Sequence, residues 1–464
     1  MREIIEDVLK LARSLGADFA DLRVTEGTGT SISVQDGIAD RVNTGHASGA
    51  GVRVLVDGAW GFAPTNNATA EEMKRCVRDA VSMAKAASAD VSDPGMVCDI
   101  EPVEDNVESE FELDPREVPL SERVQVIFEL ERAARETDRR IVNTVASYRD
   151  SAGTSIIANT AGTYITGSAV RCGLNIHVTA SDGDVRQSAS KHQSNSLGYE
   201  MIRAIDPQTF AVATAQKAVA LLAAKRAPAG KFDVIIDPLI CGLLVHEAFG
   251  HNCEADAVWS GNSILRGKEG QQVAARGVNI YDDPTLPKLN GSFPYDHEGT
   301  PAKRHVLVED GILQGYMHSL ETAARFGVRP EGSCRCQGHN YGPIVRMSNT
   351  LIAAGDCSFE DMLADTKSGL YLAGGHWGYV FTARGQFTCN VENAWAIENG
   401  KLGQHYRNVC ISGLTLETLS NVTAVGDEVR FELGGTCGKN GQGVPVDSGG
   451  PHLRISDVVV GGQE

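Results

Sequence analysis

The sequence His-Glu-Ala-Phe-Gly-His, residues 246–251, follows a long apolar stretch over residues 234–245. Two imidazoles with a carboxylate, Glu247, beside the first of them are the parts of a metal-hydrolase site. Histidine nitrogens hold zinc, and a glutamate handles the proton of the attacking water. The apolar stretch predicts a strand and then the helix that carries these residues. This segment therefore predicts a metal site built against a hydrophobic core.

The spacing of the two histidines predicts an irregular helix. His246 and His251 are five positions apart, whereas side chains four positions apart share a helix face. At ~100° per residue, five positions turn the second imidazole ~140° away on an ideal helix. Gly250 directly precedes His251, and a helix that ends there, or bulges by one residue, would swing His251 back. We therefore expect a break or a bulge at Gly250.

A catalytic zinc ion needs a third protein ligand. The candidates, first by proximity and then by softness, are Glu254, Asp256, Glu269, Cys253 and Cys437. Cys437 lies in the glycine-rich loop 434–438, which lets a backbone approach a metal closely. On the chemistry of the residues, Glu254 and Cys437 are comparable candidates.

Composition and charge exclude several classes of protein. The chain has 464 residues, enough for two or three domains, and a net charge of −18, which disfavours nucleic acid as a partner. No apolar run approaches the ~18 residues of a membrane-spanning helix, and acids stand at the N-terminus where a signal peptide would be basic. We expect a cytoplasmic protein that binds neither nucleic acid nor membrane. The 11 cysteines, without periodic spacing, are expected to be reduced thiols.

Residues 1–90 predict a small α/β unit, an antiparallel sheet flanked by helices. Apolar positions in the first 15 residues form a helical stripe. Asp-Gly pairs at 36–37 and 57–58 are hairpin signals between alternating strands. A capping box that starts at Thr69 predicts the beginning of a second helix.

A second α/β unit is expected after an acidic connection. Residues 91–118 are rich in acids and contain prolines, which predicts a linker or an extended surface crossing. Residues 119–228 then form the central unit. Its expected elements are a helix over 121–136, strands over 141–148, 155–159 and 167–181, and a long helix from Asp206-Pro207 to Leu222.

The chain changes character from residue 229. It becomes rich in glycine, and short strands between turns predict a largely antiparallel β domain over 229–464 that carries the motif helix. Residues 359–366 are the main helical exception. The predicted fold class is therefore α+β: helix-flanked antiparallel sheet units, followed by a β-rich C-terminal domain.

The chain resembles the TldD/PmbA metalloproteases over essentially its whole length, and most strongly in its second half. The motif at 246–251 fits the HExxxH element of that family. The further segments that carry the resemblance are Glu254 and Asp256, Asn290 to Gly299, Arg346 to Thr350, Ile397 to Lys401, and Cys437 to Gln442. Cys253 and Ala255 depart from the family pattern, which has an apolar residue and a glycine there.

The resemblance implies a zinc-dependent metallopeptidase with one zinc ion per catalytic chain. It implies His246, His251 and Cys437 as the ligands and Glu247 as the catalytic base. Glu254 would then orient a ligand imidazole or contact substrate. Implied substrates are peptides and small or unfolded proteins, and implied assemblies are a homodimer or a heterodimer with a related subunit. Because an extended chain can add to a sheet edge, residues 385–390 are a candidate binding strand.

The sequence is also consistent with two other functions and contains further candidate sites. A non-catalytic scaffold subunit and a protein–protein regulator of a DNA-handling enzyme are the alternatives, and the intact His-Glu-His-Cys set argues against a scaffold. His376, among glycines, is a candidate substrate contact. Cys334, Cys336 and His339 have the spacing of soft metal ligands, although loop residues near the active cleft are the favoured interpretation.

Overall fold

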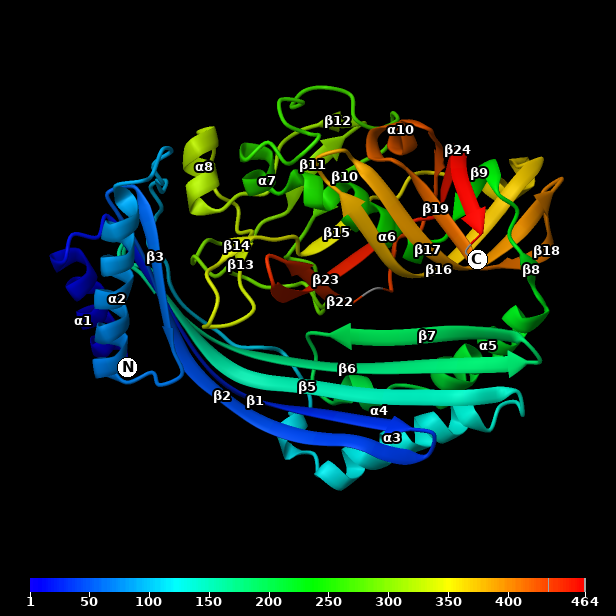
Figure 1. Ribbon diagram of the computed structural model, residues 1–464, viewed down its shortest axis with the longest axis horizontal. Helices are drawn as coiled ribbons and strands as arrows, with labels where there is room; N and C mark the ends of the chain where they lie inside the picture. Colours follow the sequence, from blue (N-terminus) through cyan, green and yellow to red (C-terminus); the bar gives the residue numbers. More distant parts are fainter. Residues whose placement is uncertain (433, 463–464) are drawn as a thin grey trace.

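The computed structural model describes residues 1–432 and 434–462, apart from the side chain of His376. A long curved sheet forms the N-terminal part, and a β-rich C-terminal domain lies along one face of it (Figure 1). Most strand pairs are antiparallel, and helices flank the sheets, which confirms the predicted α+β class. Within the described residues, no helix is long and apolar enough to cross a membrane.

One seven-stranded sheet takes strands from both predicted N-terminal units. Its strands are β1 (Phe19–Gln35), β2 (Ile38–Val56), β3 (Ala59–Thr65), β4 (Glu104–Val107), β5 (Ile141–Asn159), β6 (Tyr164–Asp182) and β7 (Val185–Asn195). The order is β3-β2-β1-β5-β6-β4, and β7 pairs with β6. The division of the chain into units stays a prediction, since β1 pairs with β2 on one side and with β5 on the other.

The hairpin turns of this sheet form where the sequence predicts them. Asp36 and Gly37 have φ values of 49° and 81°, and Asp57 and Gly58 have 49° and 76°. Positive φ at both central residues is the requirement of the tight hairpin turn that matches strand twist. The strands expected over 141–148 and 155–159 are one continuous strand, β5, because the intervening residues stay paired with β1 and β6.

Helices pack against the sheet in two groups. They are α1 (Arg2–Ser14), α2 (Ala70–Ser88), η1 (Pro115–Glu117), α3 (Leu120–Arg135), α4 (Glu200–Arg203), η2 (Gln208–Val212) and α5 (Ala213–Ala223). The helices α1 and α2 share a core with one end of the sheet, and α3 and α5 share a core with the other. The helix α2 begins after Thr69 as predicted, but the predicted capping box is wrong, because the Thr69 side chain makes no cap hydrogen bond. The acidic segment is more than a linker, since β4 pairs in parallel with β6.

The C-terminal domain is built from an eight-stranded sheet, a second sheet of seven strands and a short two-stranded one. The strands are β8 (Lys225–Arg226), β9 (Gly230–Ile236), β10 (Ile280–Asp282), β11 (His305–Glu309), β12 (Ile312–Leu313), β13 (Cys334–Arg335), β14 (Ile344–Val345), β15 (Asn349–Ile352), β16 (Ser368–Phe381), β17 (Gln386–Glu398), β18 (Lys401–Arg407), β19 (Val409–Leu414), β20 (Val422–Val425), β21 (Arg430–Phe431), β22 (Gly435–Lys439), β23 (Gln442–Gly450) and β24 (Leu453–Gly462). In the larger sheet, β16, β9, β24, β19 and β17 close a ring, because β17 pairs with β16 as well as with β19.

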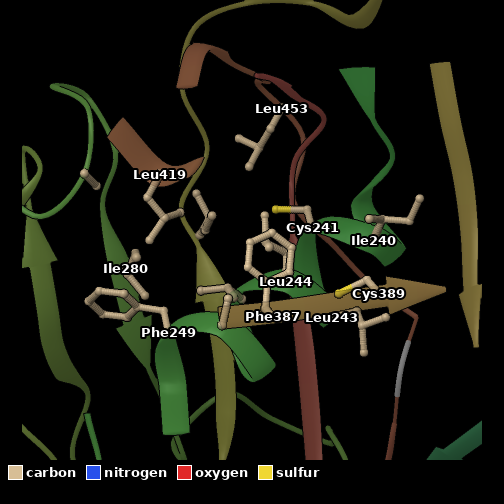
Figure 2. Packing of buried hydrophobic residues seen from close by; sticks show 14 of the residues in the cluster. Ile240, Cys241, Leu243, Leu244, Phe249, Ile280, Phe387, Cys389, Leu419 and Leu453 are labelled. Carbon is tan, nitrogen blue, oxygen red and sulfur yellow. The ribbon is translucent and has the colours of Figure 1, made fainter. Parts of the chain in front are cut away.

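The motif helix runs through the core of this domain. The helices are α6 (Pro238–Leu244), η3 (Val245–Phe249), η4 (Gly250–Cys253), α7 (Ala255–Trp259), α8 (Leu320–Phe326), α9 (Phe359–Asp365) and α10 (Thr415–Ser420). Figure 2 shows Leu243, Leu244 and Phe249 of α6 and η3 among buried side chains of the surrounding strands. The core thus fixes the backbone that carries the metal motif.

The prediction that a substrate peptide adds to residues 385–390 as to an open sheet edge is wrong. Residues 386–391 of β17 pair with β19, and residues 386–389 also pair with β16 on the other side. Both edges of this segment are therefore occupied, and an extended peptide has no free backbone groups to pair with there.

Candidate metal centre

The motif helix begins at a strong cap. The Asp237 side chain accepts a hydrogen bond of 2.8 Å from the Ile240 amide, and Pro238 follows at the first helical position. The same carboxylate accepts a second bond, of 2.8 Å, from the Gly374 amide of β16. Burial raises the pKa of Asp237 to about 6. The cap therefore ties the start of α6 to the neighbouring strand.

A π-helical turn resolves the spacing of the two histidines. Residues Val245–Phe249 form the π-helix η3, and a 3-10 turn, η4, follows from Gly250. A π-helix closes its hydrogen bonds between residues five apart, so side chains at that spacing approach one face. The rings of His246 and His251 lie 5.2 Å apart between centroids. The sequence prediction of a one-residue bulge at this point is confirmed.

Two positions of the site need glycine because neighbouring side chains lie too close to the backbone for a Cβ atom. A Cβ at Gly250 would lie 2.1 Å from the Met347 sulfur, and its φ of −56° needs no glycine. A Cβ at Gly378 of β16 would lie 2.8 Å from Cγ of Glu247. Both glycines therefore let neighbouring elements pack directly against the motif.

The structure brings together three donors that sequence analysis singled out. One ligand atom each of His246, His251 and Cys437 lie within 4.8 Å of one another. The Cys437 sulfur is 3.5 Å from Nε2 of His251. Among the described residues, this is the one such group of three or more histidine, cysteine and acidic side chains. Two imidazoles and a thiolate are an ordinary zinc donor set.

The electrostatics of the cluster favour a metal-binding thiolate. Burial alone would raise the pKa of the Cys437 thiol, but His246 and His251 outweigh it and lower the pKa to about 4. Burial opposes protonation of both imidazoles, yet the Cys437 sulfur raises the pKa of His246, and Glu254 raises that of His251 more strongly. The Nδ1 atom of His246 is buried without a hydrogen-bond partner. These residues therefore fit a bound cation, which would replace the protons they share.

Glu247 lies beside the cluster and is partly open to solvent. Its Oε2 atom is 4.0 Å from Nε2 of His251, and its side chain keeps 21% of its exposure. Burial raises the pKa of this carboxyl above its usual value. A carboxylate in this position can accept a proton from a water molecule held at the cluster.

Glu254 is placed to orient a histidine. The residue is 2% exposed, and its Oε2 atom is 3.0 Å from Nδ1 of His251. Burial would raise the pKa of Glu254, but Lys439 and His251 lower it to about 2. This geometry fits the predicted role of orienting a ligand imidazole better than contact with a substrate.

Sequence reasoning missed the cations that hold the cluster. The Lys439 ammonium lies 3.2 Å from Glu254 and 2.7 Å from Asp256. The Arg346 guanidinium donates to the Cys437 carbonyl at 2.5 Å. Lys439 stands two positions after Cys437, and that spacing on a strand was the available signal, since such residues share a face.

Cys336 and His339, from the candidate ligand set of Cys334, Cys336 and His339, form hydrogen bonds with other parts of the fold. The Cys336 sulfur lies 3.2 Å from Nδ1 of His297, and His339 bonds to Thr25 and Asn66 of the N-terminal part, both at 2.9 Å. No metal-ligand group includes these residues in the part of the chain that the structure describes. His376 lies in β16, and its side chain is outside the described residues.

The fold and the cluster together define an α+β protein with a candidate His2Cys metal centre. Three family models match the chain: PmbA/TldA metallopeptidase domain 1 over residues 20–84, the central domain over 113–226, and the C-terminal domain over 229–462. The chain belongs to this PmbA/TldA, or TldD/PmbA, family, and the resemblance seen in the sequence is confirmed.

Relatives cover nearly the full length. A protein named Metalloprotease from Methanothermobacter thermautotrophicus is 38% identical over 96% of both chains. One named Zinc metalloprotease TldD homolog from Saccharolobus solfataricus is 26% identical over 98% of this chain and 99% of the relative. A Thermotoga maritima crystal structure described as a modulator of a DNA gyrase has a TM-score of 0.80, covers 99% of this chain and 100% of its own, and is 23% identical. That structure shows a shared fold.

Proposed function

We propose that the chain is a zinc-dependent metallopeptidase that hydrolyses peptides or small unfolded proteins. The observation that carries this proposal is the approach of His246, His251 and Cys437 to within 4.8 Å, with Glu247 beside them. The printed names of the relatives, Metalloprotease and Zinc metalloprotease TldD homolog, support the reaction and the metal.

Each side chain has a defined task in this proposal. When bound, a zinc ion supplies Lewis acidity toward a water molecule and a peptide carbonyl. His246, His251 and Cys437 would hold the ion, and Glu254 would keep the His251 ring in its orientation through the 3.0 Å contact at Nδ1. Glu247 would accept the proton of the water and deliver it to the leaving amine. Its raised pKa makes the carboxylate a stronger base than an exposed one.

Two features of the proposal concern partners. We propose a dimer, either of two copies or with a related subunit, as the resemblance implies. The alternative function is a non-catalytic scaffold or a regulator of another protein, since a fold neighbour is described as a modulator of a DNA gyrase. The complete donor set of His246, His251 and Cys437 favours the peptidase, because a scaffold needs no such cluster.

Elemental analysis of the purified protein tests the metal. The wild type is expected to carry one zinc ion per chain, and His246→Ala and His251→Ala are expected to lose it. His46→Ala is the matched control, because this histidine lies on the exposed strand β2 and its side chain is 56% exposed. Full zinc content in either motif variant would contradict the assignment, and zinc-free wild type would favour the scaffold.

A further inference from the structure

One edge of β6 is paired at both ends and open between them. β4 pairs with residues 164–167, and β7 ends at Asn195 opposite Cys172. Within the described residues, 168–171 have no strand partner on this edge. The Ser109 hydroxyl donates to the Ser168 carbonyl at 2.8 Å from this side. Because backbone groups alternate between the two edges of a strand, those of Val170 face the same opening.

A cavity of about 590 Å³ lies at this opening, between the N-terminal sheet and the C-terminal domain. Its walls are largely apolar and include Val107, Ile157, Ile165, Val170 and Phe293. The charged residues on its wall include the exposed Glu108, Glu110 and Lys288. The cavity therefore offers an apolar lining next to unpaired strand backbone.

Arg171 stands in the wall of this cavity without a counter-ion. Its Nε and Nη2 atoms donate only long bonds of 3.4 Å to the Asn290 carbonyl. No acidic side chain among the described residues forms an ion pair with it. Burial lowers the pKa of Arg171 to about 10, which leaves the guanidinium charged at neutral pH. A partly buried cation with no anion is costly, so the structure favours an anionic ligand here.

Other guanidinium groups lie near His297 on the same wall. Burial and then Arg23, Arg335 and Arg171 lower the pKa of His297, which lines the same cavity, to about 3. Burial lowers the pKa of Arg335 to about 9, and Arg171 contributes to that shift. A planar guanidinium matches a carboxylate with two parallel hydrogen bonds. The net charge of −18 repels a polyanion but not a single carboxylate.

Arg171 also connects the cavity to the strand of the metal cluster. It lines a second cavity of about 470 Å³ that reaches Gly435 and Thr436 of β22, the strand of Cys437. The Asn290 amide donates to the Gly435 carbonyl at 2.7 Å. Figure 1 shows β22 and β23 next to the part of the long sheet that contains β7 and β6. A ligand at Arg171 would thus lie beside the hairpin that carries the metal-binding sulfur.

We propose that the cavity at the β6 opening binds the carboxyl-terminal end of an extended peptide, with its terminal carboxylate on Arg171. The backbone of the peptide pairs with Val170, and its last side chain enters the apolar lining. That the ligand is a peptide rests on the proposed function.

The experiment compares one peptide in two forms. An N-terminally fluorescein-labelled, unstructured pentapeptide ending in leucine is prepared as the free acid and as the C-terminal amide. Its binding to the full chain is measured by fluorescence anisotropy in a Glu247→Gln background, which prevents cleavage. We expect the acid to bind about ten-fold tighter than the amide, because a charge-assisted bidentate pair is lost in the amide.

Variants assign the preference to one side chain. Arg171→Gln is expected to bind acid and amide equally, and Arg171→Lys, which keeps the charge but not the planar fork, to retain part of the preference. Arg149→Gln is the control, since Arg149 is exposed and lines only the second cavity; it should keep the full preference. Thermal unfolding checks that each variant folds. The comparison of acid and amide in the Glu247→Gln protein, which keeps Arg171, tests the preference even if an Arg171 variant does not fold.

Two results would overturn the inference. One is equal binding of acid and amide when Arg171 is intact, and the other is an undiminished preference in Arg171→Gln. Competition by inorganic phosphate as effective as competition by the peptide acid would also overturn it, because the site would then bind anions in general. Cleavage by the wild type without an acid preference defeats this inference alone, whereas an acid preference without cleavage defeats the proposed function alone.

Discussion

The sulfur of Cys437 lies 3.5 Å from Nε2 of His251, although 186 residues separate the two in the chain. The imidazole follows a helix buried in the C-terminal domain, and the sulfur lies on β22, which pairs with β23. Val444 and Val446 of β23 pack in the same core as that helix. The meeting of the two donors is therefore a product of tertiary packing.

Replacing this sulfur should remove the metal. Cys437→Ser is expected to retain little zinc, because a hydroxyl is a harder donor and is rarely deprotonated. Elemental analysis after dialysis measures the loss. Cys410→Ser is the control, since Cys410 is a free cysteine that bonds Thr388 at 3.0 Å and lies outside the cluster. Equal zinc in the two variants would show that Cys437 is structural.

Lys439 should act on zinc affinity through Glu254. Lys439→Met leaves two carboxylates, Glu254 and Asp256, without their shared cation, so Glu254 should hold His251 less firmly. We expect zinc affinity to fall roughly ten-fold or more, as it does when partners of metal ligands are lost. Competition with a chromophoric chelator measures it. Lys288→Met, at an exposed lysine, should leave the affinity unchanged, and an unaffected Lys439→Met would rule out the positioning role.

Gly250 should be intolerant of a side chain because of Met347. Gly250→Ala is expected to destabilise the fold by about 1–3 kcal/mol, since the new methyl group overlaps the Met347 sulfur. Denaturant unfolding of both single variants and of the Gly250→Ala/Met347→Ala double variant should show a smaller cost in the Met347→Ala background. Gly45→Ala, whose Cβ meets nothing within 4 Å, is the control. Additive costs would show that the clash is not the cause.

His318 should make stability fall in mild acid. Burial, and then the charge of His305, lower the pKa of His318 to about 4 in the folded chain, whereas the unfolded chain titrates near pH 6.5. The unfolded state holds more protons between these values, so stability falls as pH falls from about 6.5 to about 4, by up to about 3 kcal/mol. His318→Gln should flatten that dependence in unfolding experiments with a chelator present. A constant difference between wild type and variant across this range would contradict the prediction.

The sequence predicts those parts of the site that depend on local geometry. The spacing of His246 and His251, with Gly250 between them, predicted the irregular turn that appears as a π-helix. The reason for the glycine was not accessible, because it lies in the approach of Met347, a residue distant in sequence. The role of Cys437 followed from family resemblance and not from spacing.

Long-range pairing limited the remaining predictions. The contact between Lys439 and Glu254 joins residues far apart in sequence, and local patterns do not encode it, whereas Glu254 lies only three positions from His251. The sequence of residues 385–390 is typical of a strand, but only the observed strand pairing shows that β16 and β19 occupy both edges of this segment. The opening on β6 is equally invisible in sequence, since it depends on where β4 and β7 end along β6.

Peptide cleavage by zinc-loaded wild type and zinc-loaded Glu247→Gln tests the central claim most directly. Products from an unstructured peptide mixture are quantified by mass spectrometry, and zinc is measured in the same samples. The amide side chain cannot accept a proton and is nearly the same shape, so we predict full zinc content and a loss of activity of about a hundred-fold or more. Undiminished cleavage by Glu247→Gln, or no cleavage by the zinc-loaded wild type, would contradict the account.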